Sequence, residues 1–259
     1  MNDLRVCMVQ LDMAWEDKEK NLETCYRLLS PLKGKVDLAV LPETFTTGFA
    51  IHSPHLAETN EETTIQTVRA WAKELDMAIA GSFLAKEADE KFFNRGFLIT
   101  PEGESCFSDK RHLFREEGKQ LSPGKKYEII PYKGWNIRLI VCYDLRFPVW
   151  IRNKANEYDL LLCVANWPKA RAHVWNILLR ARAIENLCYV CGVNRIGTDG
   201  EGISYQGESI VLDYKGYPVM EAGQEEKCVI NTFKKEPLQE FRRTFPVWRD
   251  ADFFKIAEN

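Results

Sequence analysis

Apolar residues in the first third of the chain follow two spacings that predict alternating strands and helices. Three short apolar blocks are typical of buried strands: 4–13, 36–43 and 77–83. Residues 17–32 predict a helix with one buried face, because apolar side chains recur at i, i+3, i+4 and i+7: Leu22, Cys25, Tyr26 and Leu29. Strands that alternate with helices predict a layered α/β domain with helices packed on a sheet.

A second helix is predicted between the second and third apolar blocks. Residues 60–77 bring five apolar side chains to one helical face: Ile65, Val68, Trp71, Ala72 and Leu75. Asn60 stands at the start of this segment. We expect it to cap the helix, because its short side chain can accept a hydrogen bond from a free amide of the first turn.

From about residue 94 the pattern changes to paired strand-like runs around short polar turns. Three hairpins are predicted, with turns at 101–103, 133–134 and 214–216. Further strands are predicted at 158–166, 187–194 and 226–233, and a long helix at 170–186. No linker or low-complexity segment divides the chain. We therefore predict a single domain over residues 1–259, with two sheets and with helices outside each sheet.

The chain closes with an aromatic tail, at about residues 236–259. This tail carries Phe241, Phe245, Trp248, Phe253 and Phe254. Large aromatic side chains are rarely left in solvent. We expect the tail to pack on its own domain, with docking on a second subunit as the alternative.

Composition and charge exclude several classes of partner. With 259 residues, of which 45% are hydrophobic, the chain can bury a sizeable core. The net charge of -3 has no basic stripe, so no nucleic acid is expected as a partner. No apolar run approaches the roughly 20 residues that span a bilayer, so no membrane partner is expected either. The N-terminus lacks the features of a secretion signal, and we expect a cytoplasmic protein.

The cysteines and histidines favour neither a disulfide framework nor a metal site. Eight cysteines are scattered singly along the chain, which predicts reduced and mostly buried thiols. The close pair Cys188 and Cys191 has the spacing of a redox motif, but a strand would direct these two side chains to opposite faces. The four histidines show no metal-ligand spacing, so we expect neither a metal nor another cofactor.

The first candidate for chemistry is Glu43, in "LAVLPETFTTGF". Pro42 is expected to end the preceding strand, because it cannot donate to a strand ladder. Glu43 then lies at the carboxyl end of that strand, where open α/β sheets place their ligands. The alternative is an ordinary glutamate in a surface turn.

The second candidate is the long loop that follows Lys110. Long irregular loops in compact domains are often functional. The charged residues here could instead form a solvated face: Lys110, Arg111, His112, Arg115, Glu116 and Glu117. Leu113 and Phe114 among them indicate that part of the loop turns inward.

The third candidate is Cys142, in "RLIVCYDLRFPVW". A thiol at the point where a strand becomes a turn or a helix can have its pKa lowered by backbone amides or nearby cations. The alternative is a small core residue, as most cysteines are. The sudden polarity of Tyr143, Asp144 and Arg146 weakens that alternative.

Together these residues supply the parts for amide hydrolysis. Cys142 can attack a carbonyl carbon, and Glu43 can take the thiol proton and return it to departing ammonia. A free thiol titrates near ~8.5 and a free glutamate near ~4.3, so burial that raises the glutamate pKa narrows the difference. The Lys110 ammonium and the Tyr143 N–H could hold the oxyanion, where the loss of one donor typically costs ~3 kcal/mol.

The order of these motifs resembles the nitrilase superfamily of carbon-nitrogen hydrolases. The resemblance rests on "PETF", "DKRHLF", "CYDLRFP", "ANWP", "RARAIEN", "GVNRIG" and "GESIVLDYKGYPV", which span nearly the whole chain. It implies a four-layer α-β-β-α sandwich of two mixed sheets with helices outside, commonly as a homodimer. It also implies a Glu-Lys-Cys triad at Glu43, Lys110 and Cys142. A further positioning glutamate is expected at Glu117, with Glu116 as the alternative.

The segments "CYDLRFPVW" and "KRHLF" resemble the omega-amidase branch. That resemblance implies a small-molecule amide as substrate and water as co-substrate: a short dicarboxylate monoamide such as 2-oxoglutaramate or 2-oxosuccinamate is hydrolysed through a thioester. The far carboxylate of such a substrate needs a cation, for which Arg115, Arg146 and Arg171 are available. Arg146 could equally form an ion pair with Asp144 or a glutamate.

Three further residues complete the expected pocket. Trp167 and Phe114 could form its walls, and Tyr143 lies next to the nucleophile in sequence.

An N-carbamoyl amino acid, an aliphatic amide or a nitrile is the alternative substrate. A non-catalytic scaffold would be expected to lose one of the three triad residues, and all three are present.

Overall fold

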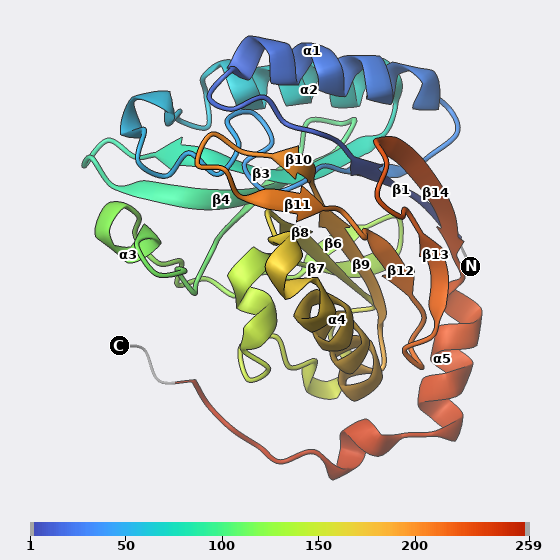
Figure 1. Cartoon of the computed structure of the whole chain (residues 1–259). Coiled ribbons are helices and arrows are strands. Elements are labelled where there is room, and N and C mark those ends of the chain that lie inside the picture. Colours follow the sequence, from blue (N-terminus) through green and yellow to red (C-terminus); the bar gives the residue numbers. More distant parts are fainter. Residues whose placement is uncertain (1–2, 257–259) are drawn as a thin grey trace.

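The two sheets predicted from the sequence are present, and they pack face to face (Figure 1). A computed structural model describes residues 3–256. The first sheet has the order β14 (Lys227–Phe233), β1 (Leu4–Gln10), β2 (Leu38–Val40), β3 (Ala78–Lys86), β4 (Phe92–Ile99) and β5 (Ser105–Asp109). The second has the order β13 (Pro218–Glu221), β12 (Ile210–Leu212), β9 (Tyr189–Asn194), β8 (Leu160–Ala165), β7 (Trp135–Val141) and β6 (Ile130–Tyr132).

Both sheets are mixed and share one plan. In each, three central strands run parallel, β1 with β2 and β3, and β7 with β8 and β9. The outer strands are antiparallel to their neighbours. A separate two-stranded sheet is formed by β10 (Ile196–Thr198) and β11 (Ser204–Gln206).

Helices cover the outer faces of the sheets. Figure 1 shows α1 (Lys18–Leu29) and α2 (Thr63–Leu75) side by side over the first sheet, and α4 (Ala172–Asn186) against the second. The short helix α3 (Glu117–Gln120) lies in the loop after β5, and α5 (Lys235–Thr244) follows the last strand. The predicted sandwich of two mixed sheets with helices outside is therefore confirmed. No helix among residues 3–256 is both long and apolar enough to cross a membrane.

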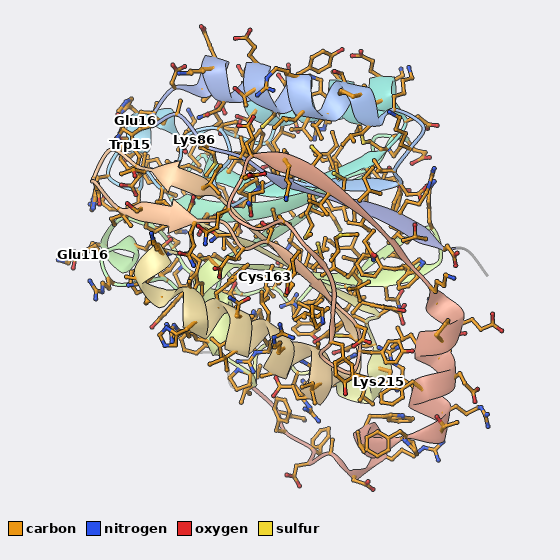
Figure 2. The ribbon with its side chains drawn as sticks, turned by 45° about the vertical axis from the view of Figure 1, so that its right-hand side comes forward. Trp15, Glu16, Lys86, Glu116, Cys163 and Lys215 are labelled. Atoms are coloured by element: carbon orange, nitrogen blue, oxygen red, sulfur yellow. The ribbon has the colours of Figure 1, made fainter. Side chains whose placement is uncertain are left out.

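Alternation along β1 explains how one strand serves two cores. Leu4, Val6 and Met8 pack in the central core, where the two sheets meet, whereas Cys7 and Val9 pack under the helices of the first sheet. Buried side chains of the second sheet join the same cluster, among them Cys163 of β8, which is paired with Gly192 of β9 on the face that α4 covers (Figure 2). Both faces of the first sheet are thus covered.

The prediction that Asn60 caps α2 is wrong. The helix begins at Thr63, after Glu62. The Glu62 carboxylate accepts the Thr59 N–H at 2.8 Å, which closes a turn over the residues where the cap was expected. The Asn60 side chain is used elsewhere and accepts a hydrogen bond from Arg95 at 3.2 Å.

The aromatic tail is packed on its own domain in part. Phe241 lies 5.0 Å from Tyr214, ring to ring, and the Phe254 ring lies 4.7 Å from the Lys154 ammonium. Phe245 and Phe253 are exposed. The last three residues of the predicted tail lie outside the described residues.

Candidate active site

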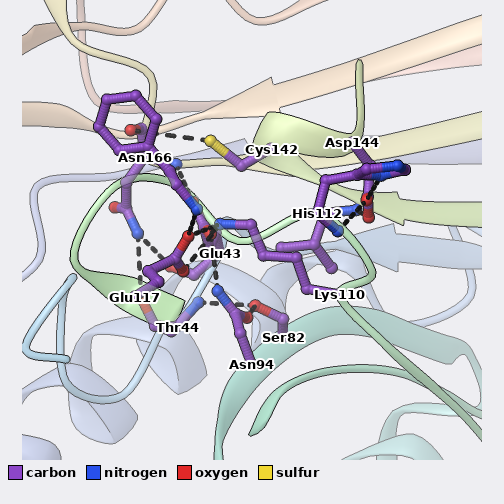
Figure 3. Close-up of polar contacts among 12 residues, drawn as sticks. Glu43, Thr44, Ser82, Asn94, Lys110, His112, Glu117, Cys142, Asp144 and Asn166 are labelled. Atoms are coloured by element: carbon purple, nitrogen blue, oxygen red, sulfur yellow. Dashed lines mark hydrogen bonds and ion pairs between the residues drawn. The ribbon is translucent and has the colours of Figure 1, made fainter. Parts of the chain in front are cut away.

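Four strands bring the candidate catalytic residues to one edge of the sandwich. Glu43 lies beyond the carboxyl end of β2, Lys110 directly follows β5, and Cys142 directly follows β7. Asn166 directly follows β8, which is parallel to β7. The packing of the two sheets therefore joins residues that are far apart in the sequence (Figure 3).

Lys110 and the two glutamates form a closed buried group. The Lys110 ammonium nitrogen lies 2.9 Å from Glu43 Oε1, and 2.9 and 2.8 Å from the two oxygens of Glu117. All three side chains have zero exposed surface. Glu116, the alternative to Glu117, is exposed and pairs with Lys119. The structure thus brings Glu117, and not Glu116, to Lys110.

Burial and charge act together on this group. Burial alone would lower the pKa of Lys110, but Glu117 and Glu43 outweigh it and raise that pKa well above its usual range. Burial raises the pKa of Glu117, against the opposing effect of the Lys110 charge. The two buried carboxylates therefore favour the ammonium form of Lys110.

Glu43 is oriented by two asparagines that the sequence analysis missed. The Asn94 side chain donates to Glu43 Oε1 at 2.7 Å, and the Asn166 backbone N–H donates to Oε2 at 2.7 Å. The Asn166 side chain also donates to the Glu43 carbonyl, at 3.0 Å. Each carboxylate oxygen of Glu43 thus has fixed donors. The only signal in the sequence for Asn166 was its place in "ANWP".

Cys142 begins a one-turn 3₁₀ segment, Cys142–Arg146, which we name the nucleophile turn. The Cys142 backbone is left-handed, with a φ of 45°, an uncommon conformation for a residue with a side chain. Its Sγ lies 4.0 Å from the Asn166 carbonyl oxygen. Burial and the negative charge of Glu43 raise the pKa of the thiol well above its usual range, although Lys110 acts in the opposite direction. Burial beside Glu43 therefore favours the protonated thiol.

The other polar residues of the nucleophile turn separate into two roles. Asp144 is buried and accepts the Val141 N–H at 3.2 Å. The suggested ion pair of Arg146 with Asp144 or a glutamate is not formed within residues 3–256. The Arg146 guanidinium instead lies over the Trp167 ring, at 5.2 Å.

A small cavity of about 60 Å³ opens above Cys142 and Lys110. Its other lining residues are Phe49, Phe114, Tyr143, Arg146, Asn166, Trp167, Pro168, Arg171, Ile203 and Tyr205. Pockets for drug-sized ligands are typically several hundred Å³, so this one suits only a small molecule. Of the three arginines considered, Arg146 and Arg171 line the cavity. Arg115 is exposed on the surface and does not.

Elsewhere, the thiols are unpaired and no metal cluster is present in the described chain. All eight cysteines are free, and Cys188 and Cys191 are both buried. No group of three potential metal ligands occurs among residues 3–256.

Comparisons with known proteins identify the family of this chain. The carbon-nitrogen hydrolase family matches residues 5–243. Omega-amidase YafV of Escherichia coli (strain K12) is 40% identical, over 99% of this chain and 100% of its own. The 2-oxoglutaramate amidase of Bacillus subtilis (strain 168) is 28% identical, over 95% of this chain and 96% of its own.

A solved structure supports the same assignment. XC1258 from Xanthomonas campestris, a CN-hydrolase superfamily protein with an arsenic adduct in its active site, has a TM-score of 0.97. It is 42% identical, over 99% of this chain and 100% of its own. The chain therefore belongs to the carbon-nitrogen hydrolase family and is an amide-hydrolysing enzyme.

Proposed function

We propose that this enzyme is an omega-amidase. Its substrate is a short dicarboxylate monoamide of the 2-oxoglutaramate or 2-oxosuccinamate type, and its products are the dicarboxylate and ammonia. The similarity to an omega-amidase and to a 2-oxoglutaramate amidase supports this choice. One structural observation carries it. The cavity is lined by Cys142, by the Lys110 ammonium that two buried carboxylates hold, and by two arginines that form no ion pair within the described chain.

Acylation uses Cys142 as nucleophile and Glu43 as base. The thiol sulfur attacks the amide carbon while its proton moves to Glu43, which the two asparagine donors hold in place. The carbonyl oxygen becomes an oxyanion, for which Lys110 and the Tyr143 N–H are the proposed donors. The carbon-nitrogen bond then breaks, Glu43 returns its proton to the nitrogen, and ammonia leaves a thioester on Cys142.

Deacylation reverses the proton path. A water molecule attacks the thioester carbon and gives a proton to Glu43, and the same donors hold the second oxyanion. The carbon-sulfur bond breaks, the proton returns to sulfur, and the carboxylic acid product leaves. The high pKa of the Cys142 thiol favours this last proton transfer.

Glu117 is proposed as a positioning residue. Its carboxylate holds the Lys110 ammonium through both of its oxygens and also accepts the Phe114 N–H at 2.5 Å. The same side chain thus fixes the oxyanion donor and one wall of the cavity. A lysine free to move would lose much of its effect on the transition state, because preorganised charges act without a reorganisation cost.

Arg146 and Arg171 are proposed to bind the far carboxylate of the substrate. Their guanidinium groups lie over aromatic rings of the cavity, Arg146 on Trp167 and Arg171 on Phe114, at 5.2 and 5.1 Å. Such stacking leaves the planar edge of a guanidinium free for a carboxylate. Arg115 is too exposed for this role.

The homodimer and the cytoplasmic location also remain proposals. Ile177 and Ile184 lie on α4 with more than half of their surface exposed, and Tyr217 and Val219 of the following hairpin are exposed too. The close approach of Gly216 to Ile184 places this hairpin beside α4, so the apolar residues form one surface.

The proposed cytoplasmic location is supported by the cysteines, because eight free thiols are typical of a reducing compartment.

A panel of substrates tests the proposed function. Initial rates of product formation are compared for 2-oxoglutaramate, 2-oxosuccinamate, an N-carbamoyl amino acid, a neutral aliphatic amide and a nitrile. The omega-amidase proposal expects the highest kcat/KM for one of the two oxo-amides. A higher kcat/KM for the carbamoyl compound, the neutral amide or the nitrile would reject it.

A further inference from the structure

The structure links the lysine loop to the nucleophile turn through one pair of side chains, His112 and Asp144. Asp144 Oδ1 accepts two hydrogen bonds from His112, at 2.9 Å from the backbone N–H and at 2.8 Å from ring Nδ1 (Figure 3). The other carboxylate oxygen accepts the Val141 N–H at 3.2 Å. We propose that His112 and Asp144 form a positioning clamp that holds Lys110 and Cys142 in their reactive arrangement.

The places of these residues in the chain make the clamp effective. His112 is two residues after Lys110, and Asp144 is two residues after Cys142. The bond between them therefore joins the proposed oxyanion donor to the nucleophile across segments that are 32 residues apart. The Val141 bond lies on the other side of Cys142. Asp144 thus spans the left-handed backbone at Cys142 and fixes the direction of the Tyr143 N–H.

The His112 ring is itself held in one orientation. It stacks on Phe147 with a centroid distance of 3.7 Å and an interplanar angle of 6°. Since an ionised carboxylate only accepts hydrogen bonds, Nδ1 is the protonated ring nitrogen in this contact. A ring with a fixed plane and a fixed tautomer can hold the Asp144 carboxylate in one orientation, as outer hydrogen-bond partners in active sites commonly do.

The far end of the nucleophile turn is anchored separately. Arg182 of α4 donates to the Leu145 carbonyl from two nitrogens, at 3.1 and 2.7 Å. Because these bonds from Arg182 remain, loss of the His112 ring should leave the nucleophile turn folded. The position of Cys142 relative to Lys110 should nevertheless become less well defined. The clamp is therefore expected to affect rate more than stability.

Three substitutions at His112 test the clamp. In His112→Asn the side-chain amide can place a donor near the position of Nδ1, whereas His112→Gln places it farther out and His112→Ala removes it. We expect kcat to fall roughly 10- to 100-fold in the Ala and Gln variants, because small displacements of reacting groups cost about this much. KM should change little, and the Asn variant should retain most of the rate.

A second readout does not depend on the substrate. The rate at which iodoacetamide alkylates Cys142, followed by peptide mass spectrometry, should fall in the Ala and Gln variants and recover in the Asn variant. The clamp rests on Cys142 and Lys110 as catalytic groups, but this readout remains valid if the omega-amidase proposal fails. Tyr127→Phe is the matched control, since it removes a partly buried hydrogen bond to Glu157 outside the site.

The outcomes are distinct. Loss of kcat and of Cys142 reactivity in the Ala and Gln variants, with recovery in the Asn variant and an unfolding temperature close to that of the control, supports the clamp. Wild-type kcat in the Ala variant would overturn it. An Asn variant as slow as the Ala variant, or a rate loss explained by unfolding in all three, would also overturn it.

Discussion

Lys110 and Glu117 form a two-pronged ion pair without any exposed surface: the ammonium nitrogen lies 2.9 and 2.8 Å from the two carboxylate oxygens. Solvent cannot screen either charge, because neither side chain is exposed. The ammonium charge is therefore balanced only by the carboxylates of Glu117 and Glu43. In this structure Lys110 and Cys142 line the same cavity. The position of the Lys110 ammonium, and with it the proposed oxyanion site, therefore depends on Glu117.

Glu117→Gln is expected to reduce kcat about 100-fold, because it releases one side of the ammonium and misplaces a group that acts in the transition state. Steady-state kinetics on the preferred amide measure this loss. Glu116→Gln is the matched control, since the neighbouring glutamate is exposed. Equal activity of the two variants would contradict the role assigned to Glu117.

Arg146→Ala and Arg171→Ala are expected to raise KM for 2-oxoglutaramate. A hydrogen bond to a charged group contributes about 1.5–3 kcal/mol, which corresponds to a rise of roughly 10- to 100-fold. The rate on a neutral amide such as butyramide should not fall, because that substrate has no carboxylate to lose. Arg115→Ala serves as the exposed control. The assignment is wrong if both substrates are affected equally, or if Arg115→Ala has the larger effect.

Burial is expected to move two pH dependences upward from those of free side chains: the acid limb of kcat/KM and the ionisation of the Cys142 thiol. Burial raises the pKa of Glu117 above its ordinary 4.5. As the pH falls, Glu117 is therefore protonated before 4.5 is reached, and kcat/KM should begin to fall at that higher pH. Burial also raises the pKa of Cys142 above its ordinary 9.0, so the thiol remains protonated as the pH rises through 9.0.

Two measurements check this prediction. A profile of kcat/KM should show its acid limb above pH 4.5, and the rate of Cys142 alkylation should still be rising above pH 9.0. An alkylation rate that reaches a plateau below pH 9.0 would show a thiol with a lowered pKa. It would be incompatible with a proton transfer from sulfur to Glu43 during attack.

If the apolar surface on α4 is the dimer interface, charged substitutions on it should convert the dimer into a monomer. The wild-type chain is expected at twice its monomer mass of 30.0 kDa in light scattering after size exclusion, and the variant Ile177→Asp/Ile184→Asp at 30.0 kDa. Ile230→Asp is the control, because Ile230 is also exposed but lies on β14. A monomeric wild type, or a dimer that tolerates both aspartates, would reject this interface.

Local pattern was sufficient to predict most of the fold. Apolar blocks predicted the strands of both sheets, because a strand buried on both faces is a continuous apolar run. Helical spacing predicted the main helices, because a helix buried on one face has apolar residues every three or four positions. The cap of α2 was missed, since the Glu58 carboxylate competes for the free amides of the first turn: it accepts the Thr64 N–H at 3.4 Å, while the Asn60 side chain accepts from Arg95. Such competition depends on side-chain bonds that a spacing rule does not contain.

The site was predictable only where polarity broke an apolar strand. Glu43, Lys110 and Cys142 stand at such breaks. Asn94 lies inside β4, and Asn166 was counted as the last residue of a predicted buried strand although it directly follows β8. Their bonds to Glu43 span 51 and 123 residues, so they exist only after the two sheets have packed. The choice between Arg115 and Arg171 likewise depended on which loop faces the cavity.

The most direct test of the account is ammonia release from 2-oxoglutaramate by the wild-type enzyme and by Cys142→Ala, with circular dichroism to verify that the variant folds. The account predicts steady release by the wild type and none above background by the folded variant. Turnover by the folded Cys142→Ala enzyme at a rate comparable to that of the wild type would contradict nucleophilic catalysis by Cys142.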